Sequence, residues 1–251
     1  MDPSPLQINY PLHDASADSN HKGISLPVSL DHARITVLPQ SAFYIPNFIS
    51  EEEERVILGK IAAAPKPRWK QLTHRRLQTW PSDLVKNKLL DAPLPPWLEG
   101  PVVSRLLSLP VQEAHSGHIF DGSAHGRPNH DGAAYWPVVC TVSLGASLCL
   151  NLYRSKDDGA LDPEPAWRIL QEPRSLLITT EQLYTGYLHG IADIEEDAEL
   201  SADSIANWSL LRDADAFADG RNIRQTRTSL TYRDVLGVSK VANKLGMFLK
   251  R

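Results

Sequence analysis

The sequence predicts a mainly β protein with flanking helices, an α+β chain whose strands form a β-sandwich or jelly roll. Several short apolar or alternating runs, separated by Gly, Pro and Asp, follow Pro137, and this spacing is typical of such folds. A helix signal precedes them at Ser50. With 251 residues, 42% of them hydrophobic, the chain can bury one sizeable core, which favours a single domain with tails.

The first expected elements lie before that region. Residues 1–30 are rich in Pro, Ser, Asp and Asn without hydrophobic periodicity, which predicts a flexible leader. Residues 33–38 and 42–45 predict a first pair of strands. Ser50 is a good N-cap, and the four glutamates after it suit the positive end of a helix. The apolar side of this helix is Val56, Ile57, Ile61 and Ala64.

Two further segments separate this helix from the strand region. Residues 65–82 combine cations with two tryptophans and contain no acidic residue. They have no clean period, which indicates an exposed, ordered loop or short ribbon. Residues 94–109 predict a turn followed by a short amphipathic helix.

The strand region itself begins near residue 138. Strands are predicted over residues 138–144, 148–153, 175–178, 183–188 and 228–232. The polar stretches 154–172 and 193–224, the second of them acidic, are expected to be surface loops. Residues 238–251 form a basic tail.

Composition excludes several classes of protein. A net charge of −4 excludes a polycation that binds nucleic acid by bulk attraction. Cys140 and Cys149 lie in apolar runs without paired metal-ligand spacing, which predicts reduced thiols in the nucleus or cytoplasm. No run approaches the roughly 18 apolar residues of a membrane span, so no membrane partner is expected. No long apolar stripe is left unused, so we expect a monomer.

Four residues suggest a metal and cosubstrate site. Asp131, His189 and the later pair Arg227 and Arg233 stand in the order in which an iron and 2-oxoglutarate oxygenase presents its ligands. Carboxylate and imidazole would bind the metal, and guanidinium the cosubstrate. Residues i and i+6 of a strand share a face, so both arginines would point the same way, with Ser229 between them. This arrangement suits a buried dicarboxylate, because Arg stays charged and pairs bidentately.

The first metal ligand departs from this pattern. Such sites use His-x-Asp, and Asn129 stands where the first His belongs. On an extended segment Asn129 and Asp131 would share a face, and His130 would point away. Asn129 could offer its amide oxygen, a weaker ligand for Fe(II) than imidazole, and a bulge could turn His130 toward the metal. The third ligand therefore stays open between Asn129 and His130.

An ordered set of motifs resembles the AlkB family of Fe(II)/2-oxoglutarate-dependent dioxygenases, and within it the subfamily called AlkB homologue six. Each motif is weak alone, but together they run in order from about residue 43 to 235. The motifs are Pro65-Lys-Pro-Arg-Trp69, Arg75-Arg76-Leu-Gln-x-Trp80, Leu94-Pro-Pro-Trp97-Leu98, Asp131-Gly-Ala-Ala-Tyr-Trp-Pro-Val138, Thr141-Val-Ser-Leu-Gly145, Glu172-Pro-Arg-Ser-Leu176, Leu188-His-Gly-Ile191 and Arg227-x-Ser-Leu-Thr-x-Arg233.

The resemblance implies a double-stranded β-helix, of the jelly-roll or cupin-like kind, over residues 31–237. It implies Fe(II) held by Asp131 and His189, 2-oxoglutarate anchored by Arg227 with Arg233 alongside, and O2 as the other cosubstrate. The implied reaction is oxidative demethylation, in which decarboxylation of the keto acid drives hydroxylation of an N-alkyl group. Members of the family act on nucleic acids or proteins.

The basic segment 65–82 matches the part of the family that forms a nucleotide-recognition lid. Its tryptophans could stack on bases while its arginines contact phosphate. The alternative is that the tryptophans are core residues. The candidate lid residues are Arg68, Trp69, Arg75, Arg76, Trp80 and Tyr135.

The match to the family is poor over residues 113–129. The family's Asn-x-Tyr, whose Tyr helps to hold the keto acid, aligns with His118-Ile-Phe120, so Phe120 is the candidate at that position. Three explanations compete: lost activity, a rearranged metal site, and a local error of reading frame in this block. The alternative function is therefore a catalytically impaired pseudoenzyme that binds nucleic acid or protein without oxidising it.

Overall fold

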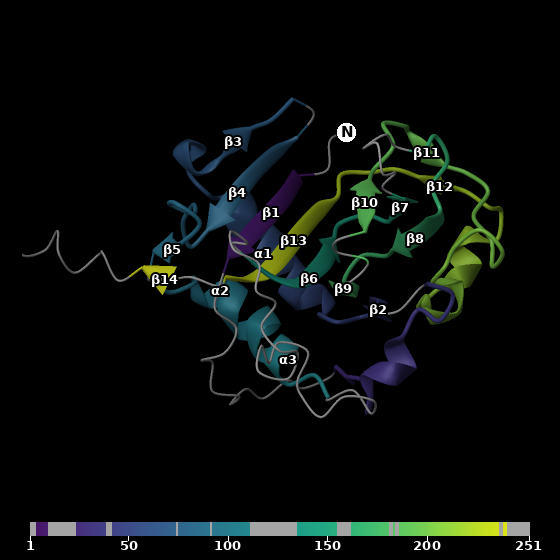
Figure 1. Cartoon of the computed structure of the whole chain (residues 1–251), viewed down its shortest axis with the longest axis horizontal. Helices are drawn as coiled ribbons and strands as arrows, with labels where there is room; N and C mark the ends of the chain where they lie inside the picture. The colour runs from purple at the N-terminus through teal and green to yellow at the C-terminus, as the bar shows by residue number, and fades with distance from the viewer. Residues whose placement is uncertain are drawn as a thin grey trace, which may run out of the picture.

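The structure is a computed structural model that describes residues 4–9, 24–38, 42–73, 75–90, 92–110, 135–154, 162–180, 183, 186–235 and 238–239. Within these ranges two β-sheets face each other, and the main helices pack on the outer side of the larger sheet (Figure 1). The sheets are mainly antiparallel and the helices few. The predicted β-rich jelly roll is therefore confirmed.

The larger sheet has seven strands in the described part of the chain, in the order β2-β9-β6-β13-β1-β4-β3. In that order they are β2 (Ala42–Ile45), β9 (Leu176–Thr180), β6 (Tyr135–Leu144), β13 (Thr228–Val235), β1 (Ser4–Asn9), β4 (Arg76–Trp80) and β3 (Lys70–Gln71). The first four pair antiparallel, and β1 runs parallel to both of its neighbours. The pairing of β6 with β13 sets Ser143 opposite Ser229.

The smaller sheet has the strand order β10-β7-β8 among the described residues. Its strands are β10 (Tyr187–Gly190), β7 (Leu148–Arg154) and β8 (Trp167–Gln171). β8 corrects the expectation that residues 154–172 form a polar surface loop. Its Arg168 and Gln171 obscure the apolar pattern in the sequence, whereas Ile169 and Leu170 are fully buried.

Side-chain alternation gives the larger sheet two different faces. Leu230 and Tyr232 of β13 pack with the helices in the main core. Tyr44 and Leu177 point the other way, into a second core that they share with Leu152 and other residues of the smaller sheet. The residues of β13 that alternate with Leu230 and Tyr232 therefore face the space between the sheets.

Helix α1 (Glu51–Ala62) begins at the predicted N-cap. Glu53 donates its backbone N–H to Ser50 Oγ at 3.2 Å, and Ser50 donates its own to Glu53 Oε2 at 2.7 Å, so the two residues form a capping box. Ile57 and Ile61 pack on the larger sheet, whereas Val56, expected on the apolar side, is exposed.

A second helical run covers the same face of the sheet (Figure 1). It consists of α2 (Pro96–Leu98), the π-helical turn η3 (Glu99–Val103) and α3 (Ser104–Leu107). Its Arg105 is 1% exposed and donates to Glu53 Oε1 at 2.8 Å and to the Phe48 carbonyl at 2.7 Å. The helix predicted within 94–109 is confirmed, and Glu53 links it to α1.

The expected first strand pair is wrong for residues 33–38. A 3-10 helix, η1 (Leu30–Ala33), leads into this segment, and Arg34 forms only an isolated bridge with Phe43. Ile35 and Leu38 both pack in the core between the sheets. The chain turns so that residues three apart reach the same core, which a strand with alternating side chains does not allow.

The expected flexible leader over residues 1–30 is wrong for residues 4–9, which form β1, and for Ser29 and Leu30, which are buried. β1 lies between β13 and β4 and pairs with both through its backbone. Because backbone pairing does not require a particular side-chain pattern, composition did not reveal this strand. In the basic tail, β14 (Val238–Ser239) pairs with β5 (Leu89–Leu90), and residues 240–251 lie outside the described residues.

Residues 193–224 form a folded layer rather than a surface loop. The layer contains β11 (Glu196–Asp197), η4 (Trp208–Leu210), η5 (Ala214–Phe217) and β12 (Asn222–Ile223), and it lies beside β7 and β8 (Figure 1). Its buried residues Leu200, Ile205 and Phe217 form a core with Cys149 and Leu170 of the smaller sheet. The many acidic residues of this segment suggested an exposed loop, so its core was not predicted. One of these acids, Asp197, is in fact buried and pairs with Arg224 at 2.6 Å.

Glu54 fastens α1 to two turns of the sheets. It is 8% exposed and accepts from the Gly145 N–H at 2.8 Å and from Arg174 Nη1 at 2.9 Å. Gly145 has φ +85°, and a Cβ on it would lie 2.7 Å from the Thr226 carbonyl oxygen. Glu54 therefore holds a turn that favours glycine at its tip.

We expect Glu54→Ala to destabilise the protein by about 2 to 4 kcal/mol, because it leaves a largely buried guanidinium and a backbone N–H without their shared partner. Chemical denaturation followed by circular dichroism measures this change. Glu52→Ala is the matched control, since Glu52 lies two residues earlier on α1 and pairs with Arg55 at the exposed surface. Equal effects of the two substitutions would contradict the anchoring role of Glu54.

Candidate functional site

Arg227 is a buried cation between the two sheets. It is 4% exposed, and its Nη2 donates to Ser143 Oγ at 2.8 Å and to Gln171 Oε1 at 2.9 Å. Among the described residues, no carboxylate forms an ion pair with it. Burial lowers the pKa of Arg227 to about 10, with a smaller contribution from the charge of Arg224. The guanidinium thus stays charged at neutral pH, while its hydrogen bonds with described residues go to neutral groups.

The two acceptors of Arg227 come from opposite sheets. Ser143 lies on β6 and Gln171 on β8, and the Ser143 hydroxyl also donates to Gln171 Oε1 at 2.9 Å. Ser229 is buried beside them, since it pairs with Ser143 across β6 and β13. Sequence reasoning named Arg227 and Ser229 but missed Ser143 and Gln171. Ser143 stood within one of the family motifs, whereas Gln171 lay in a stretch interpreted as a loop.

Arg227 lies immediately before β13 and reaches Ser143 on the face between the sheets, and Arg233 of β13 points to the same face, as the i, i+6 spacing predicts. The Nε of Arg233 is buried and makes no hydrogen bond within the described residues. Its guanidinium carbon lies 5.3 Å from the centre of the Tyr135 ring. Arg233 and Tyr135 are therefore neighbours, so Tyr135, predicted in the substrate lid, lies beside one of the two arginines expected to hold the cosubstrate.

His189 lies on β10 opposite Leu152, a residue of the core between the sheets, so the imidazole shares the face that Arg227 and Arg233 occupy on the other sheet. Its Nε2 lies 3.3 Å from the Leu183 carbonyl oxygen. The ring keeps an exposed edge, but protein groups crowd its other side. The loss of hydration lowers the pKa of His189, the Leu183 contact opposes this, and the charge of Arg233 adds to the lowering. A neutral imidazole is the form that binds metal ions.

The other predicted metal ligands lie outside the described residues, as does one cosubstrate candidate. The metal ligands are Asp131, Asn129 and His130, and the cosubstrate candidate is Phe120. Within the described residues, no group of three or more His, Cys, Asp and Glu side chains could hold a metal ion. The neutral imidazole of His189 suits Fe(II), and the buried guanidinium of Arg227 suits the carboxylate of 2-oxoglutarate. The described residues thus fit the cosubstrate and one position of the metal.

Gly190 allows a close contact immediately after His189. A Cβ at this position would lie 2.7 Å from Tyr153 Cε2, and the Tyr153 hydroxyl accepts from Asn151 Nδ2 at 3.1 Å. The glycine thus admits the Tyr153 ring against β10. Gly190 thereby sets how β10, and His189 on it, lies on β7.

The segment 65–82 contains η2 (Lys66–Arg68) followed by a hairpin of β3 and β4. Of the loop and the ribbon expected here, the ribbon is therefore the one that forms. Figure 1 shows it at one end of the larger sheet. Arg68 lies 4.1 Å over the Trp80 ring and also donates to the Thr79 and Pro81 carbonyls at 3.4 and 3.3 Å. Its guanidinium is thus used within the hairpin, whereas phosphate contact was expected.

The two hairpin tryptophans take part in the core, one of the two roles weighed for them. Trp69 and Trp80 pack partly against the main core, and Trp80 meets the Trp97 ring edge-on at 5.6 Å. Arg76 lies 4.0 Å over the Trp69 ring. Arg75 and Arg76 are both exposed, so both direct their charge to solvent.

An aromatic group near His189 was not identified from the sequence. Trp167 and Tyr187 have ring centres 5.1 Å apart, and the Arg154 guanidinium lies 5.6 Å from the Trp167 ring centre. The three residues come from the ends of β8, β10 and β7, on the face of the smaller sheet that carries His189. Only strand alternation combined with the correct register could have grouped them.

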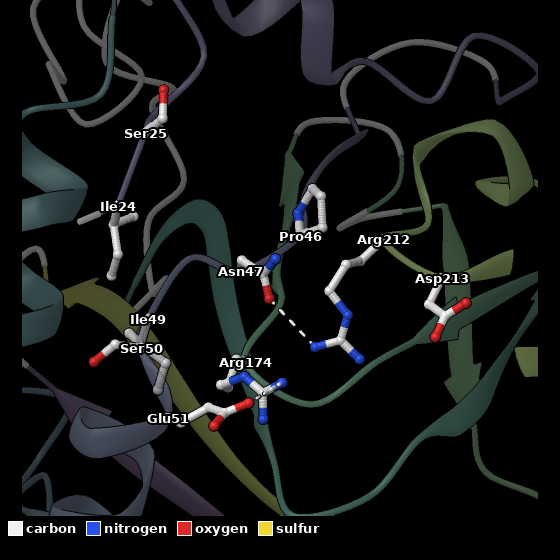
Figure 2. A pocket seen from close by; sticks show the side chains of 10 residues that line it. All are labelled: Ile24, Ser25, Pro46, Asn47, Ile49, Ser50, Glu51, Arg174, Arg212 and Asp213. Carbon is white, nitrogen blue, oxygen red and sulfur yellow. Dashed lines mark hydrogen bonds and ion pairs between the residues drawn. The ribbon is translucent and has the colours of Figure 1, made fainter.

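A cavity of about 680 Å³ lies apart from these residues. Figure 2 shows it between the turn at Pro46 and Asn47, the start of α1, and the segment at Arg212. None of the residues with predicted roles lines it. Arg212 contacts Asn47 Oδ1 at 3.3 Å and Arg174 pairs with Glu51 and Glu54, so its cations already have partners.

Comparison with known proteins supports the resemblance. No protein-family model matches the chain. A protein of Danio rerio described as "Probable RNA/DNA demethylase ALKBH6" is 32% identical over 218 residues, which cover 83% of this chain and 91% of that relative. Similarity over nearly the whole length of the relative shows that the two proteins share a family. In the described part of the chain, no helix has the length and apolar character needed to span a membrane.

We expect Gly190→Ala to destabilise the protein by about 1 to 2 kcal/mol, because the added methyl group displaces the Tyr153 ring. Denaturation with urea measures the change. Gly59→Ala is the control: a Cβ at the exposed Gly59 of α1 meets nothing within 4 Å, and alanine there should stabilise the helix by about 0.5 to 1 kcal/mol. A neutral or stabilising Gly190→Ala would show that Tyr153 does not pack closely on β10.

Proposed function

Since the chain belongs to the AlkB family, in the branch similar to ALKBH6, we propose that it is an Fe(II)/2-oxoglutarate-dependent dioxygenase that demethylates an N-alkylated nucleic acid. Fe(II) and 2-oxoglutarate dependence is general to this family. The relative is described as a probable RNA/DNA demethylase, which favours nucleic acid over protein as the substrate. Activity in the nucleus or cytoplasm is part of the proposal.

The observation that carries the proposal is the buried charge of Arg227. A desolvated guanidinium without an anion costs several kcal/mol, and its described hydrogen bonds go to neutral acceptors. A carboxylate of 2-oxoglutarate would supply the missing anion in a charge-assisted pair. If this position served only stability, an apolar side chain would stabilise the fold better than a buried arginine.

The other residues on the same faces have roles consistent with this anchor. Arg233, with its buried Nε free of hydrogen bonds in the described residues, would orient the end of the cosubstrate nearer the metal. His189 would hold the metal together with Asp131. When bound, Fe(II) supplies the oxidising chemistry that couples O2 and the keto acid to hydroxylation of the substrate. Ser229 lines the polar wall next to Ser143.

The hairpin of residues 65–82 would receive the nucleic acid. Arg75 and Arg76 are exposed there, so both are available to contact phosphate. Arg68 supports the hairpin from within, as its contacts with Trp80 and two carbonyls indicate. The partly buried Trp69 and Trp80 would stack on bases only through the surface that the arginines leave open.

A second candidate function rests on Asn129. With a neutral amide in place of the first imidazole, the metal site would bind Fe(II) weakly. The protein would then be a binding module that keeps the hairpin and the dicarboxylate pocket but does not oxidise its ligand.

Asn129→His combined with His130→Glu should raise Fe(II)-dependent conversion of 2-oxoglutarate to succinate. Even an outer partner of a metal ligand changes metal affinity by about 10- to 100-fold, so a restored ligand should have at least that effect. Succinate release measures it, and the same variant with Arg227→Gln is the control that should lose turnover. If only the restored variant turns over 2-oxoglutarate, the natural chain is the binding module. If neither the natural chain nor the restored variant turns it over, the enzyme proposal is contradicted.

Arg75→Gln should weaken binding to single-stranded oligonucleotides and reduce the slope of log K against log salt by roughly 0.7, the value for one phosphate contact. We choose Arg75 because Arg76 also packs on Trp69. Fluorescence anisotropy at several salt concentrations gives the slope. Arg221→Gln is the matched control, an exposed arginine paired with Glu196 at 3.1 Å in the acidic layer. If both substitutions change the slope equally, the hairpin is not the nucleic-acid contact.

A further inference from the structure

The neutrality of the groups around Arg227 carries a further inference, which rests on the proposed function. We infer that Gln171 is a positioning residue for the cosubstrate: with Ser143 it holds the Arg227 guanidinium by neutral hydrogen bonds and leaves its charge for a carboxylate. Under the proposed function, that carboxylate belongs to 2-oxoglutarate.

The geometry fixes one side of the guanidinium. Arg227 donates from Nε to Ser143 Oγ at 3.3 Å and from Nη2 to both Ser143 Oγ and Gln171 Oε1 at 2.8 and 2.9 Å. Ser143 donates in turn to Gln171 Oε1 at 2.9 Å. The three side chains close a small ring that ties β6, β8 and β13 together. The described hydrogen bonds thus use Nε and Nη2, and none uses Nη1.

Gln171 accepts a hydrogen bond from Arg227 without neutralising the charge of the guanidinium. It is 2% exposed, so its amide oxygen has little competition from water, and its hydrogen bond from a charged donor is strong. A glutamate has nearly the same shape and would fit the same space. Its carboxylate, however, would pair with Arg227 and compete with the carboxylate of the ligand.

The next residue, Glu172, is an acid whose carboxylate has partners other than Arg227. Glu172 is also 2% exposed, but its carboxylate accepts from the Tyr44 hydroxyl at 3.0 Å and from the backbone N–H groups of Arg212 and Asp213 at 2.8 and 3.1 Å. Successive side chains of an extended segment point to opposite sides. The chain therefore places a neutral acceptor toward Arg227 and the adjacent acid away from it.

Gln171→Glu tests this role. Glutarate, a dicarboxylate of the same carbon number without the keto group, serves as probe, so no metal is needed. We expect the melting temperature of the variant to be unchanged or higher, since Arg227 gains an ion pair. We expect its affinity for glutarate, measured by calorimetry on the full chain, to fall by about tenfold or more, the loss of one charge-assisted pair. A purely structural role would change stability and affinity together.

Gln225→Glu is the matched control. Gln225 lies two residues before Arg227 but is exposed, so the same added charge should leave glutarate affinity within about twofold because solvent screens it. Should Gln171→Glu not fold, Ser143→Asp presents a carboxylate to the same guanidinium from the other sheet and carries the same expectation.

The outcomes separate the two proposals. If the natural chain binds neither glutarate nor 2-oxoglutarate, the proposed function fails and this inference with it. If the natural chain binds glutarate and Gln171→Glu binds it equally well, or loses stability and affinity together, only the positioning role of Gln171 is overturned. Loss of affinity at retained stability, with Gln225→Glu unaffected, supports it.

Discussion

A positive charge enclosed between two sheets, with no acid paired to it among the residues that the structure describes, is the constraint on which this structure depends. Arg227 is 4% exposed, and burying an ion without a partner costs several kcal/mol. The surroundings must therefore supply hydrogen bonds without supplying negative charge. Ser143 and Gln171 do so from two different sheets. Stability alone would favour an apolar side chain here, which is why we propose that the charge serves to bind an anion.

Three buried acids of the scaffold, Glu54, Asp197 and Glu172, have partners other than Arg227. Glu54 holds Arg174 and the Gly145 turn against α1, and Asp197 pairs with Arg224 in the layer outside the smaller sheet. Glu172 binds Tyr44 and the segment at Arg212. These contacts fasten helices and loops to the sheets. They also keep the nearby carboxylates from neutralising Arg227, so the same residues serve stability and the site.

The sequence predicted those parts of the candidate site that depend on local patterns. It did not predict the parts that depend on how the sheets pack. The spacing of Arg227 and Arg233 predicted a shared face, and Ser50 predicted the start of α1, because strand alternation and helix capping act over a few residues. β1 escaped prediction because its place depends on two backbones that lie far along the chain. Arg68 was expected at phosphate, yet its contacts lie within its own hairpin, since the nearest acceptors were carbonyls made available by the turn.

The sequence by itself determined the family, the β-rich fold, the order of the candidate ligands and the odd residue among them, Asn129. These are properties of composition, motif order and short-range periodicity. Only the tertiary structure decided that the charge of Arg227 meets Ser143 and Gln171, which lie 84 and 56 residues away along the chain. Contacts over such separations depend on how the sheets pack and in which register their strands pair. No local pattern encodes that choice, because many registers satisfy the same alternation.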